Sequence, residues 1–368
     1  MFITIFISAW TVMHAYVFWR LSSIPFIHNH LSRPYVFLVA AICWVALFGW
    51  RFLDSRGWES TAAWLERFSL NWLGVLFLLF CCFLAVDLVT VFGVAFRQHV
   101  YTARTVALAA GVLLALTAFV QAHRAPVVND YEIKLANLPR DEDGLRIAAI
   151  SDLHVGRVLD GPWLAARIEQ IQALHPDLVV IVGDLFEGDE EWEDREKLIP
   201  LFKSIAAQYG VYAVTGNHDP HRSGDRLASF LQSAGVKLLH NEWVQLTPGL
   251  ALGGVDDGGH SDTLNSAERR VRQTLAAKPM TGATIFLYHR PQLVNLVASA
   301  GVGLMLSGHT HSGQIWPFSY VVQLINPLLE GKYVIDGMPL IISRGAGTWG
   351  PRMRLWQRGE IVVITLRA

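Results

Sequence analysis

The stretch SGHTHSGQ, residues 307–314, places two histidines one residue apart in a glycine-rich turn. Gly308 and Gly313 permit a sharply bent backbone there, because glycine adopts unusual backbone angles without steric penalty. A bent turn would bring the rings of His309 and His311 to one point, where they could bind one metal ion or two adjacent ions. Taken alone, the stretch is also compatible with a polar surface turn, so other residues must distinguish the two.

Four more polar groups each follow an apolar run that has the composition of a buried strand. In chain order they supply Asp152 and His154, then Asp184, then Asn217, His218 and Asp219, and finally His289. The carboxyl ends of strands are where ligands bind in open α/β sheets. One such group recurs by chance, but five at successive strand ends indicate a single site.

The elements that must position these groups alternate along the chain. The predicted strands are 145–151, 177–183, 211–216, 283–289 and 303–308, and the predicted helices are about 162–174, 194–208, 223–234, 264–277 and 291–300. This alternation predicts βαβ units and a mostly parallel sheet. Short apolar runs in 236–256 and 332–366 predict a second, partly antiparallel sheet. Pro291 fits the first turn of the last helix.

The types of ligand indicate which metal chemistry to expect. Carboxylate, amide and imidazole groups without a thiolate disfavour structural zinc and favour a catalytic centre of Mn, Fe or Zn. Two cations ~3.5–4 Å apart need a bridging carboxylate, and a water between them becomes a nucleophile suited to phosphate esters. Asp184, in a tight Gly-Asp turn, is the expected bridge. The chain lacks G-x-S-x-G, H-E-x-x-H and G-x-x-x-x-G-K, which argues against a serine hydrolase, a zincin and a P-loop enzyme.

In this order the motifs resemble those of the calcineurin-like metallophosphoesterases: D-x-H, G-D, G-N-H-D/E, H and G-H-x-H. The resemblance covers roughly residues 140–366. SGHTHSGQIWP and the later SRGAGTWGPRMRL (343–355) resemble the membrane-associated bacterial branch of the family. Some members of that branch act on phosphodiesters, and related enzymes cleave the pyrophosphate of UDP-2,3-diacylglucosamine. The resemblance implies a four-layer α/β/β/α sandwich over residues 140–368.

The resemblance also implies roles for the matching residues. One divalent ion would be held by Asp152, His154, Asp184 and His311, and the other by Asp184, Asn217, His289 and His309. His218 resembles the family's general acid, which protonates the leaving oxygen. Asp219 would orient and charge-stabilise that imidazole. The two ions would be Mn, Fe or Zn.

Residues 1–122 hold almost all of the long apolar runs. Four segments, about 2–19, 35–53, 70–96 and 105–122, approach or reach the ~20 apolar residues that cross a bilayer. They predict a transmembrane module, followed by a linker and first strand over 123–139. The first segment lacks a basic n-region and a cleavage site, which favours a retained span over a signal peptide. Buried helices of a soluble core are the alternative, but these segments have no polar face.

The membrane side of the module is ambiguous. Arg51, Arg56, Arg67, Arg124, Lys134 and Arg140 would share the side of the termini, against Arg20, Arg33, Arg97 and Arg104 on the other side. The excess of basic residues on the side of the termini favours a cytoplasmic C-terminal domain. The first span favours the opposite orientation, because its only nearby arginine, Arg20, follows it. We expect a multi-pass protein of the cell (inner) membrane. Asp87 lies within the third span, where a carboxylate is costly, so it has a function, pairs with a neighbouring helix, or lies near enough to the end of the span to be hydrated.

Composition limits the partners. The chain has 30 Lys+Arg against 31 Asp+Glu, and without a basic excess we expect no nucleic-acid partner. The sequence therefore predicts a membrane-bound dinuclear enzyme that hydrolyses a phosphodiester or pyrophosphate bond, of a lipid-linked or membrane-proximal substrate. A phosphomonoesterase or protein phosphatase, and a non-catalytic membrane ligand sensor, are the alternatives. The oligomeric state stays open.

Other candidates are weaker. Arg344 and Arg352 could contact a substrate phosphate, although solvated surface positions suit them better. His221 could line the pocket or lie in a solvated loop. Glu187 and Asp189 are expected to form an exposed acidic turn. No partner pattern accompanies His175, His240 and His260.

Overall fold

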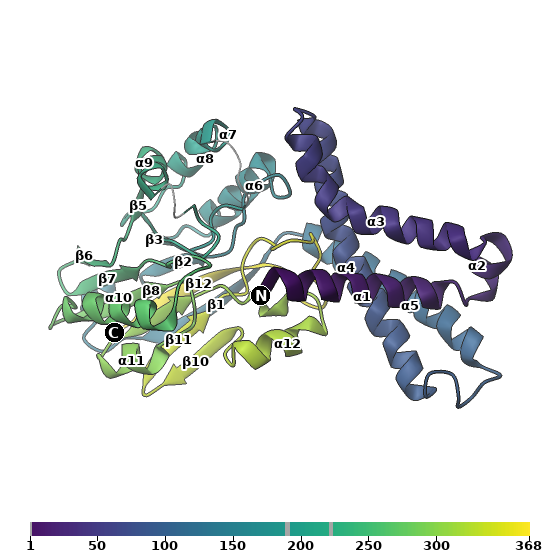
Figure 1. Cartoon of the computed structure of the whole chain (residues 1–368). Helices are drawn as coiled ribbons and strands as arrows, with labels where there is room; N and C mark the ends of the chain where they lie inside the picture. The colour runs from purple at the N-terminus through teal and green to yellow at the C-terminus, as the bar shows by residue number, and fades with distance from the viewer. Residues whose placement is uncertain (1, 188–191, 221–223) are drawn as a thin grey trace. The chain divides into compact units, whose positions relative to one another are not determined.

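The computed structural model describes residues 2–187, 192–220 and 224–368. The chain forms two compact units, whose elements are labelled in Figure 1. The helical unit comprises Met1–His123 and Gly350–Trp356, and the sandwich unit comprises Arg124–Trp349 and Gln357–Ala368. Each unit has its own hydrophobic core, so each is described by itself.

The helical unit is built from apolar helices. They are α1 (Phe2–Leu21), α2 (Pro25–His30), α3 (Arg33–Asp54), α4 (Glu59–Val89) and α5 (Val100–His123). Among the described residues, α3, α4 and α5 are long and apolar enough to cross a membrane. The expected first span corresponds to α1, which is not among these candidates. The expected third span is wrong at its end, because the helix stops at Val89 and Val91 and Phe92 have positive φ angles.

Asp87 joins three elements of the helical unit. Its carboxylate accepts hydrogen bonds from the Tyr16 hydroxyl (2.5 Å) and Arg20 Nε (2.6 Å), and it lies 3.4 Å from a guanidinium nitrogen of Arg104. That guanidinium also donates to Ser23 Oγ at 3.1 Å. Asp87 is fully buried, so these partners offset the cost of removing its charge from water. The expectation that Asp87 pairs with neighbouring helices is confirmed.

Residues 350–356 also pack within the helical unit. The backbone N–H of Arg354 donates to the carbonyl of Ala118 on α5 at 2.9 Å, and that of Arg352 donates to Asn71 Oδ1 on α4 at 2.9 Å. These bonds hold the backbone of Arg352 against α4, and the substrate contact considered for its side chain stays a prediction.

The first sheet of the sandwich unit has the strand order β1-β12-β2-β3-β4-β5. Its strands are β1 (Val127–Lys134), β12 (Glu360–Arg367), β2 (Arg146–Ile150), β3 (Leu178–Val182), β4 (Val211–Val214) and β5 (Val236–Leu238). Strands β2 to β5 are parallel, whereas β12 pairs antiparallel with β2 and parallel with β1. All five residues of β3 are buried, as expected for a parallel strand that is covered on both faces.

The second sheet has the order β10-β11-β9-β8-β7-β6. Its strands are β10 (Gly331–Ile335), β11 (Met338–Ile342), β9 (Leu304–Ser307), β8 (Ala283–Tyr288), β7 (Leu250–Val255) and β6 (Glu242–Thr247). The four central strands are parallel, and β6 and β10 pair antiparallel at the edges. The second sheet is partly antiparallel as expected, but its expected strands are partly wrong. Strands β5 and β12, from 236–256 and 332–366, belong to the first sheet, whereas β8 and β9 belong to the second.

Helices cover the outer faces of the two sheets (Figure 1). The described helices are α6 (Gly161–Gln172), α7 (Trp192–Glu196), α8 (Ile199–Lys203), α9 (Gly224–Ser233), α10 (Leu264–Ala276), α11 (Val294–Ser299) and α12 (Phe318–Ile325), with 3₁₀ turns η1 (Arg140–Glu142) and η3 (His311–Gly313). One apolar core lies between the sheets and includes Val180 and Ile285. Two outer cores include Phe202 of α8 and Val271 of α10. The four-layer α/β/β/α sandwich is confirmed.

Two expected helix boundaries are wrong, each for a local reason. The helix expected over 194–208 is divided into α7 and α8, because Pro200 has no backbone N–H and is tolerated only in the first turn of a helix, here that of α8. The helix expected at Pro291 begins at Val294, after Leu293 in a left-handed conformation. The first strand, β1 (Val127–Lys134), lies within the range 123–139 that was expected to hold a linker and a first strand.

Candidate metal centre

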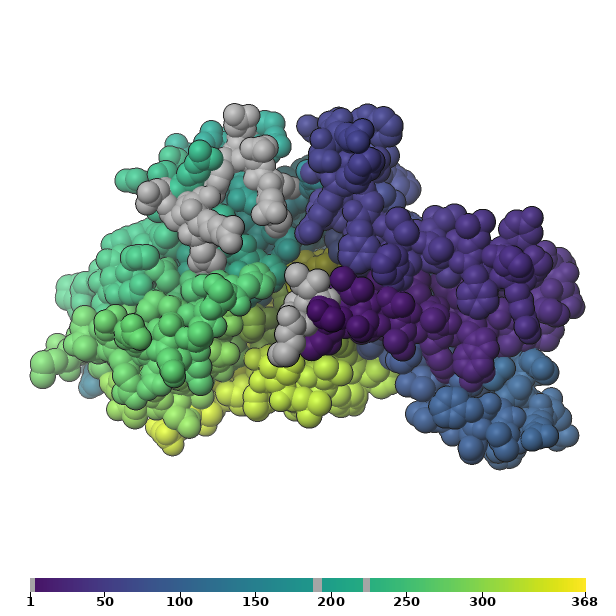
Figure 2. All heavy atoms as spheres, viewed as in Figure 1, coloured from purple at the N-terminus to yellow at the C-terminus, as the bar shows by residue number. Residues whose placement is uncertain are grey.

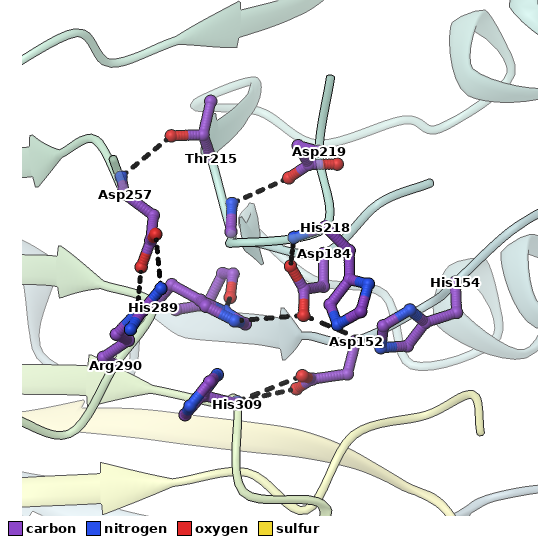
Figure 3. Close-up of polar contacts among 12 residues, drawn as sticks. Asp152, His154, Asp184, Thr215, His218, Asp219, Asp257, His289, Arg290 and His309 are labelled. Atoms are coloured by element: carbon purple, nitrogen blue, oxygen red, sulfur yellow. Dashed lines mark hydrogen bonds and ion pairs between the residues drawn. The ribbon is translucent and has the colours of Figure 1, made fainter. Parts of the chain in front are cut away.

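The expected ligands all follow strands whose carboxyl ends meet at one edge of the sandwich. Asp152 follows β2, Asp184 follows β3, Asn217 follows β4, His289 follows β8, and His309 and His311 follow β9. Figure 3 shows the resulting convergence of side chains from both sheets. The structure therefore brings every residue predicted to bind metal to one edge.

Several of these residues have strained backbones. Asp152, His154, Asp184, His309 and His311 have φ angles of 53°, 45°, 51°, 74° and 49°. Left-handed backbone is uncommon in residues other than glycine, and it clusters at functional sites where the surrounding structure enforces it. Here the enforcement includes backbone bonds between the loops, such as His154 N–H to the Asp184 carbonyl at 3.0 Å.

The first group of ligands is Asp152, His154 and His311. Their potential ligand atoms all lie within 4.8 Å of one another. His154 Nε2 is 3.0 Å from His311 Nε2, which in turn is 3.5 Å from Asp152 Oδ1. The other carboxylate, Asp184, places Oδ2 3.7 Å from His154 Nε2. These atoms enclose a point suited to one cation.

The second group is Asp184, His289 and His309, also within 4.8 Å of one another. His289 Nδ1 lies 2.8 Å from the Val182 carbonyl, so Nε2 is the ring nitrogen that faces the site and can bind a cation when it is unprotonated. That Nε2 lies 3.2 Å from Asp184 Oδ2, while Asp184 Oδ1 accepts from the backbone N–H of His218 at 2.8 Å. Asp184 therefore lies between the two groups, as a bridging ligand must.

The buried polar atoms fit divalent cations. Asn217 Oδ1 and His289 Nε2 are buried without a hydrogen-bond partner among the described residues. Such orphaned acceptors are costly in a protein interior. Two unprotonated imidazole nitrogens 3.0 Å apart, as in His154 and His311, would repel each other unless a proton or a cation lay between them. The nitrogen and oxygen donors suit a catalytic metal site.

The pKa values of the same residues are shifted by the charged groups that lie close together at the site. Burial disfavours a charged His289, but the nearby Asp184 carboxylate outweighs it and raises the pKa of His289 to about 10. Burial and the neighbouring His289 lower the pKa of His309 to about 3. Burial opposes ionisation of Asp184, yet the charge of His289 holds the pKa of that carboxyl well below its usual range. Positive charge at this point thus stabilises the buried carboxylate, and a cation would supply it.

Glu187 contacts two histidines at the site. Its Oε2 lies 2.5 Å from His154 Nδ1 and 3.2 Å from His218 Nδ1. Hydrogen bonds from both rings outweigh burial and lower the pKa of Glu187 to about 2. The expectation of an exposed acidic turn missed these contacts of Glu187, although the Glu187 side chain is 38% exposed. Asp189 and His221 lie outside the described residues.

Asp219 makes different contacts from those expected. Its carboxylate accepts from the backbone N–H groups of Leu185 (2.9 Å), Phe186 (3.1 Å) and Gly216 (2.7 Å). Burial, together with the charge of Asp184, raises the pKa of Asp219 to about 6. Asp219 thus ties the loop after β3 to the loop after β4, and the carboxylate on the His218 ring is that of Glu187.

Two further side chains border His218. The exposed His260 ring lies 4.7 Å from the His218 ring, and the Trp349 ring lies 5.7 Å from it, both measured between centroids. Arg290 holds the loop before His260 through Asp257 (2.6 Å) and the Gly259 carbonyl (2.9 Å). No pattern in the sequence connects these residues with His218, since they are distant along the chain.

The remaining candidates lie elsewhere. Arg344 forms ion pairs with Glu330 (2.9 Å) and Glu360 (3.2 Å), so it is neither a solvated residue nor a member of the ligand groups. His240, expected to be ordinary, forms an ion pair with Asp256.

Comparison with known proteins agrees with this geometry. The calcineurin-like phosphoesterase family matches residues 145–313. An uncharacterized metallophosphoesterase of Campylobacter jejuni is 31% identical over 263 residues, which cover 70% of this chain and 67% of the relative. The chain belongs to the calcineurin-like metallophosphoesterases. The matched residues include every expected ligand, from Asp152 to His311.

Two other relatives extend the comparison of this metallophosphoesterase. A Danio rerio protein named as a transmembrane protein with metallophosphoesterase domain is 31% identical over 291 residues, 74% of this chain and 63% of the relative. An uncharacterized metallophosphoesterase of Helicobacter pylori is 33% identical over 246 residues, 66% of this chain and 64% of the relative. The chain spans about two thirds of the length of these relatives. Its domain is that of a metal-dependent phosphoester hydrolase.

Proposed function

We propose that this metallophosphoesterase hydrolyses a phosphodiester or pyrophosphate bond with two divalent cations. The observation that carries the proposal is the pair of ligand groups that meet at Asp184, with buried acceptors left unpaired beside them. Asp152, His154, Asp184 and His311 would hold one ion, and Asp184, Asn217, His289 and His309 the other. Mn, Fe and Zn all suit these donors.

The cations would neutralise phosphoryl oxygens and lower the pKa of a coordinated water. The protein's own contribution is to hold the ligands before the ions arrive. Asp152 accepts the backbone N–H of His309 at 3.0 Å, which fixes the loop after β9 against the loop after β2. Asp219 fixes the loops after β3 and β4 in the same way. A site assembled in advance spends less free energy on ordering when substrate and ions bind.

His218 is the proposed general acid. Its Nδ1 faces Glu187, which leaves Nε2 to donate a proton to the leaving oxygen. After the transfer, the remaining N–H would stay at Nδ1, where Glu187 accepts it. The His218 ring is partly exposed, between His260 and Trp349, so a substrate can reach it. Glu187 takes the orienting role that the family resemblance implied for Asp219.

The helical unit supports a location at the membrane. Three of its helices are long and apolar enough to cross a bilayer, and relatives carry transmembrane names. We propose a multi-pass protein of the inner membrane, with α1 as a fourth span beside α3, α4 and α5, and the catalytic domain over residues 140–368 after a linker and strand at 123–139. A lipid-linked or membrane-proximal substrate follows from this location.

The test is hydrolysis by the full chain in detergent, stripped of metal and reloaded with Mn²⁺. Bis-(p-nitrophenyl) phosphate, p-nitrophenyl phosphate and a UDP-diacylglucosamine-type pyrophosphate would be compared. We expect metal-dependent turnover of a diester or the pyrophosphate that Asp184→Asn abolishes. Asp194→Asn, at an exposed position on α7, is the matched control and should retain activity.

Two outcomes would contradict the proposal. Faster turnover of p-nitrophenyl phosphate than of the diester and the pyrophosphate would identify a phosphomonoesterase. Absence of turnover on all three compounds, with metal binding intact, would favour a ligand sensor.

A further inference from the structure

The segment 315–329, IWPFSYVVQLINPLL, contains no charged residue. It includes α12, none of whose residues is buried. Six large side chains of the segment are exposed: Leu324 by 86%, Ile325 by 77% and Tyr320 by 62%, with lesser exposure at Trp316, Phe318 and Val321. In Figures 1 and 2, α12 and the yellow-green atoms around it lie on the outer surface of the sandwich unit. Within the described part of that unit, no other element covers these side chains.

The exposed side chains form a continuous face. Phe318, Val321 and Ile325 are three and four residues apart, and Tyr320 and Leu324 are four apart, so each set lies along one side of the helix. Single exposed apolar residues are ordinary on a protein surface, but contiguous apolar patches mark sites of protein or membrane interaction. The face therefore requires an occupant.

The helix is fixed to the metal-ligand loop. Gly313 ends η3, which begins at His311, and has a φ of 70°. A Cβ at Gly313 would overlap the backbone of Ser319, so only glycine permits this close approach of α12. Gln314 exchanges two hydrogen bonds with the backbone of Trp349 (3.1 and 2.9 Å), and the Trp349 ring borders His218. Gln314 thus connects the loop that precedes α12 with Trp349, whose ring borders His218.

We propose that α12, with Trp316, is an interfacial anchor whose apolar face lies in the headgroup and acyl boundary of a lipid bilayer. The same chain has three helices long and apolar enough to cross that bilayer, so a membrane surface is the apolar partner within reach of a tethered domain. Trp and Tyr, here Trp316 and Tyr320, are enriched at the membrane interface. The lack of charge over residues 315–329 agrees with hydrophobic insertion rather than attraction to lipid charge. The inference rests on the membrane location proposed above, but not on catalysis.

The test places a fluorescent label on α12 in the full chain. Cys43, Cys81 and Cys82 are replaced by alanine, and Leu324→Cys is labelled with a nitrobenzoxadiazole probe. The protein is reconstituted into phosphatidylcholine/phosphatidylglycerol vesicles. Emission is then measured with doxyl-labelled phospholipid, which quenches from within the bilayer, and with iodide, which quenches from water. Retained helical circular dichroism shows that each variant is folded.

Two control positions make the result interpretable. Met280→Cys is a 98% exposed site on the same unit, so it shares the sidedness of position 324 and reports aqueous exposure. Leu113→Cys, on α5, reports whether the helical unit is in the bilayer. We expect doxyl-labelled lipid to quench the label at position 324, as it quenches the label at position 113. Iodide should quench the label at position 280 but not the label at position 324.

Each other outcome is decisive. Strong iodide quenching at 324, with lipid quenching at 113, would overturn the inference and leave the membrane location intact. Protection of position 324 from both quenchers would also overturn it, because the face would then be covered by protein, whether this chain's own or a second copy's. Lack of lipid quenching at 113 would refute the membrane location itself.

Discussion

Glu187 provides the sharpest test of the site, because its role depends on contacts between segments that are distant along the chain. One carboxylate oxygen lies 2.5 Å from His154 Nδ1 and 3.2 Å from His218 Nδ1. The contact with His154 turns that ring so that Nε2 faces the metal position beside His311. Glu187→Gln keeps the size of the side chain but removes its charge. We expect this variant to bind metal more weakly.

The structure limits the size of the effect. Removing the partner of a metal-ligating histidine typically weakens metal binding by about 10–100-fold. The Glu187 side chain is 38% exposed, so solvent screens part of its interaction and favours the lower end of that range. A tenfold loss corresponds to about 1.4 kcal/mol. The loss should be smaller than that for Asp184→Asn, which removes the proposed bridging ligand.

The assay is calorimetric titration of Mn²⁺ into the metal-stripped full chain in detergent. Glu268→Gln is the matched control, because it neutralises a carboxylate whose described partner is Arg272 on the same helix, far from the metal ligands in the sequence. We expect a roughly tenfold higher Kd for Glu187→Gln and an unchanged Kd for the control. At saturating metal, Glu187→Gln should also lower kcat, because His218 loses the carboxylate that orients it.

An unchanged metal affinity in Glu187→Gln would refute the reasoning. Glu187 would then be the surface carboxylate that the sequence indicated, and the contact with His154 would not orient a ligand. Equal losses in Glu187→Gln and Glu268→Gln would show a nonspecific effect of charge and would refute it as well.

Three further predictions concern the same unit. Gly216→Ala places a Cβ against the backbone nitrogen and the carboxylate of Asp184, so we expect this variant to lose Mn²⁺ binding in the same titration. Unchanged Mn²⁺ binding would show that the loop after β4 can move to accept the Cβ. Removing the metal with a chelator should lower the thermal unfolding temperature, because ions at 100 times Kd stabilise the folded state by about 2.7 kcal/mol. An unchanged unfolding temperature would argue against a metal site that is present only in the folded protein. Asp262→Asn tests an ion pair: burial raises the pKa of Asp262, but hydrogen bonds from Arg270 outweigh burial and hold it below its usual range. The pair therefore stabilises the fold above the unfolded-state pKa and loses its effect as pH falls through the lower folded-state pKa. Unfolding of the variant in detergent should show a deficit of about 1–3 kcal/mol at pH 7 that disappears in strong acid, and a deficit independent of pH would exclude this pair as its source.

The sequence predicted the strands, and it grouped the candidate metal ligands, because both depend on local signals. Runs such as Leu178–Val182 are apolar at every position, which is sufficient to indicate a strand buried on both faces. Residues just after such strands share one edge of a sheet, so Asp152, Asp184 and His289 could be grouped from the sequence alone. Helix boundaries were less predictable, because the start of α11 depends on the unusual conformation of Leu293.

The carboxylate on His218 could not be predicted in the same way. The family resemblance implied Asp219 as the partner, but the oxygens of Asp219 accept hydrogen bonds from the backbone N–H groups of two loops. Glu187 reaches the ring because Val155 and Phe186 form an isolated bridge, and Glu187 N–H bonds to the Val155 carbonyl at 3.0 Å. That bridge joins segments without a strand pattern. The contact is thus set by tertiary structure.

The apolar face of α12 is a second feature whose surroundings cannot be predicted from the sequence. A hydrophobic run at helical spacing indicates that a helix has an apolar face, but not what covers it, since a protein core and a lipid boundary favour the same residues. For α10, the structure shows Val271 buried against the second sheet. For α12, it shows Leu324 and Ile325 exposed beside the loop that carries His311. If lipid covers that face, the membrane would hold the entrance of the metal centre at the bilayer surface, where a lipid-linked phosphoester can reach it without leaving the bilayer. The quenching experiment on α12 therefore bears on the class of substrate even while the substrate itself is unidentified.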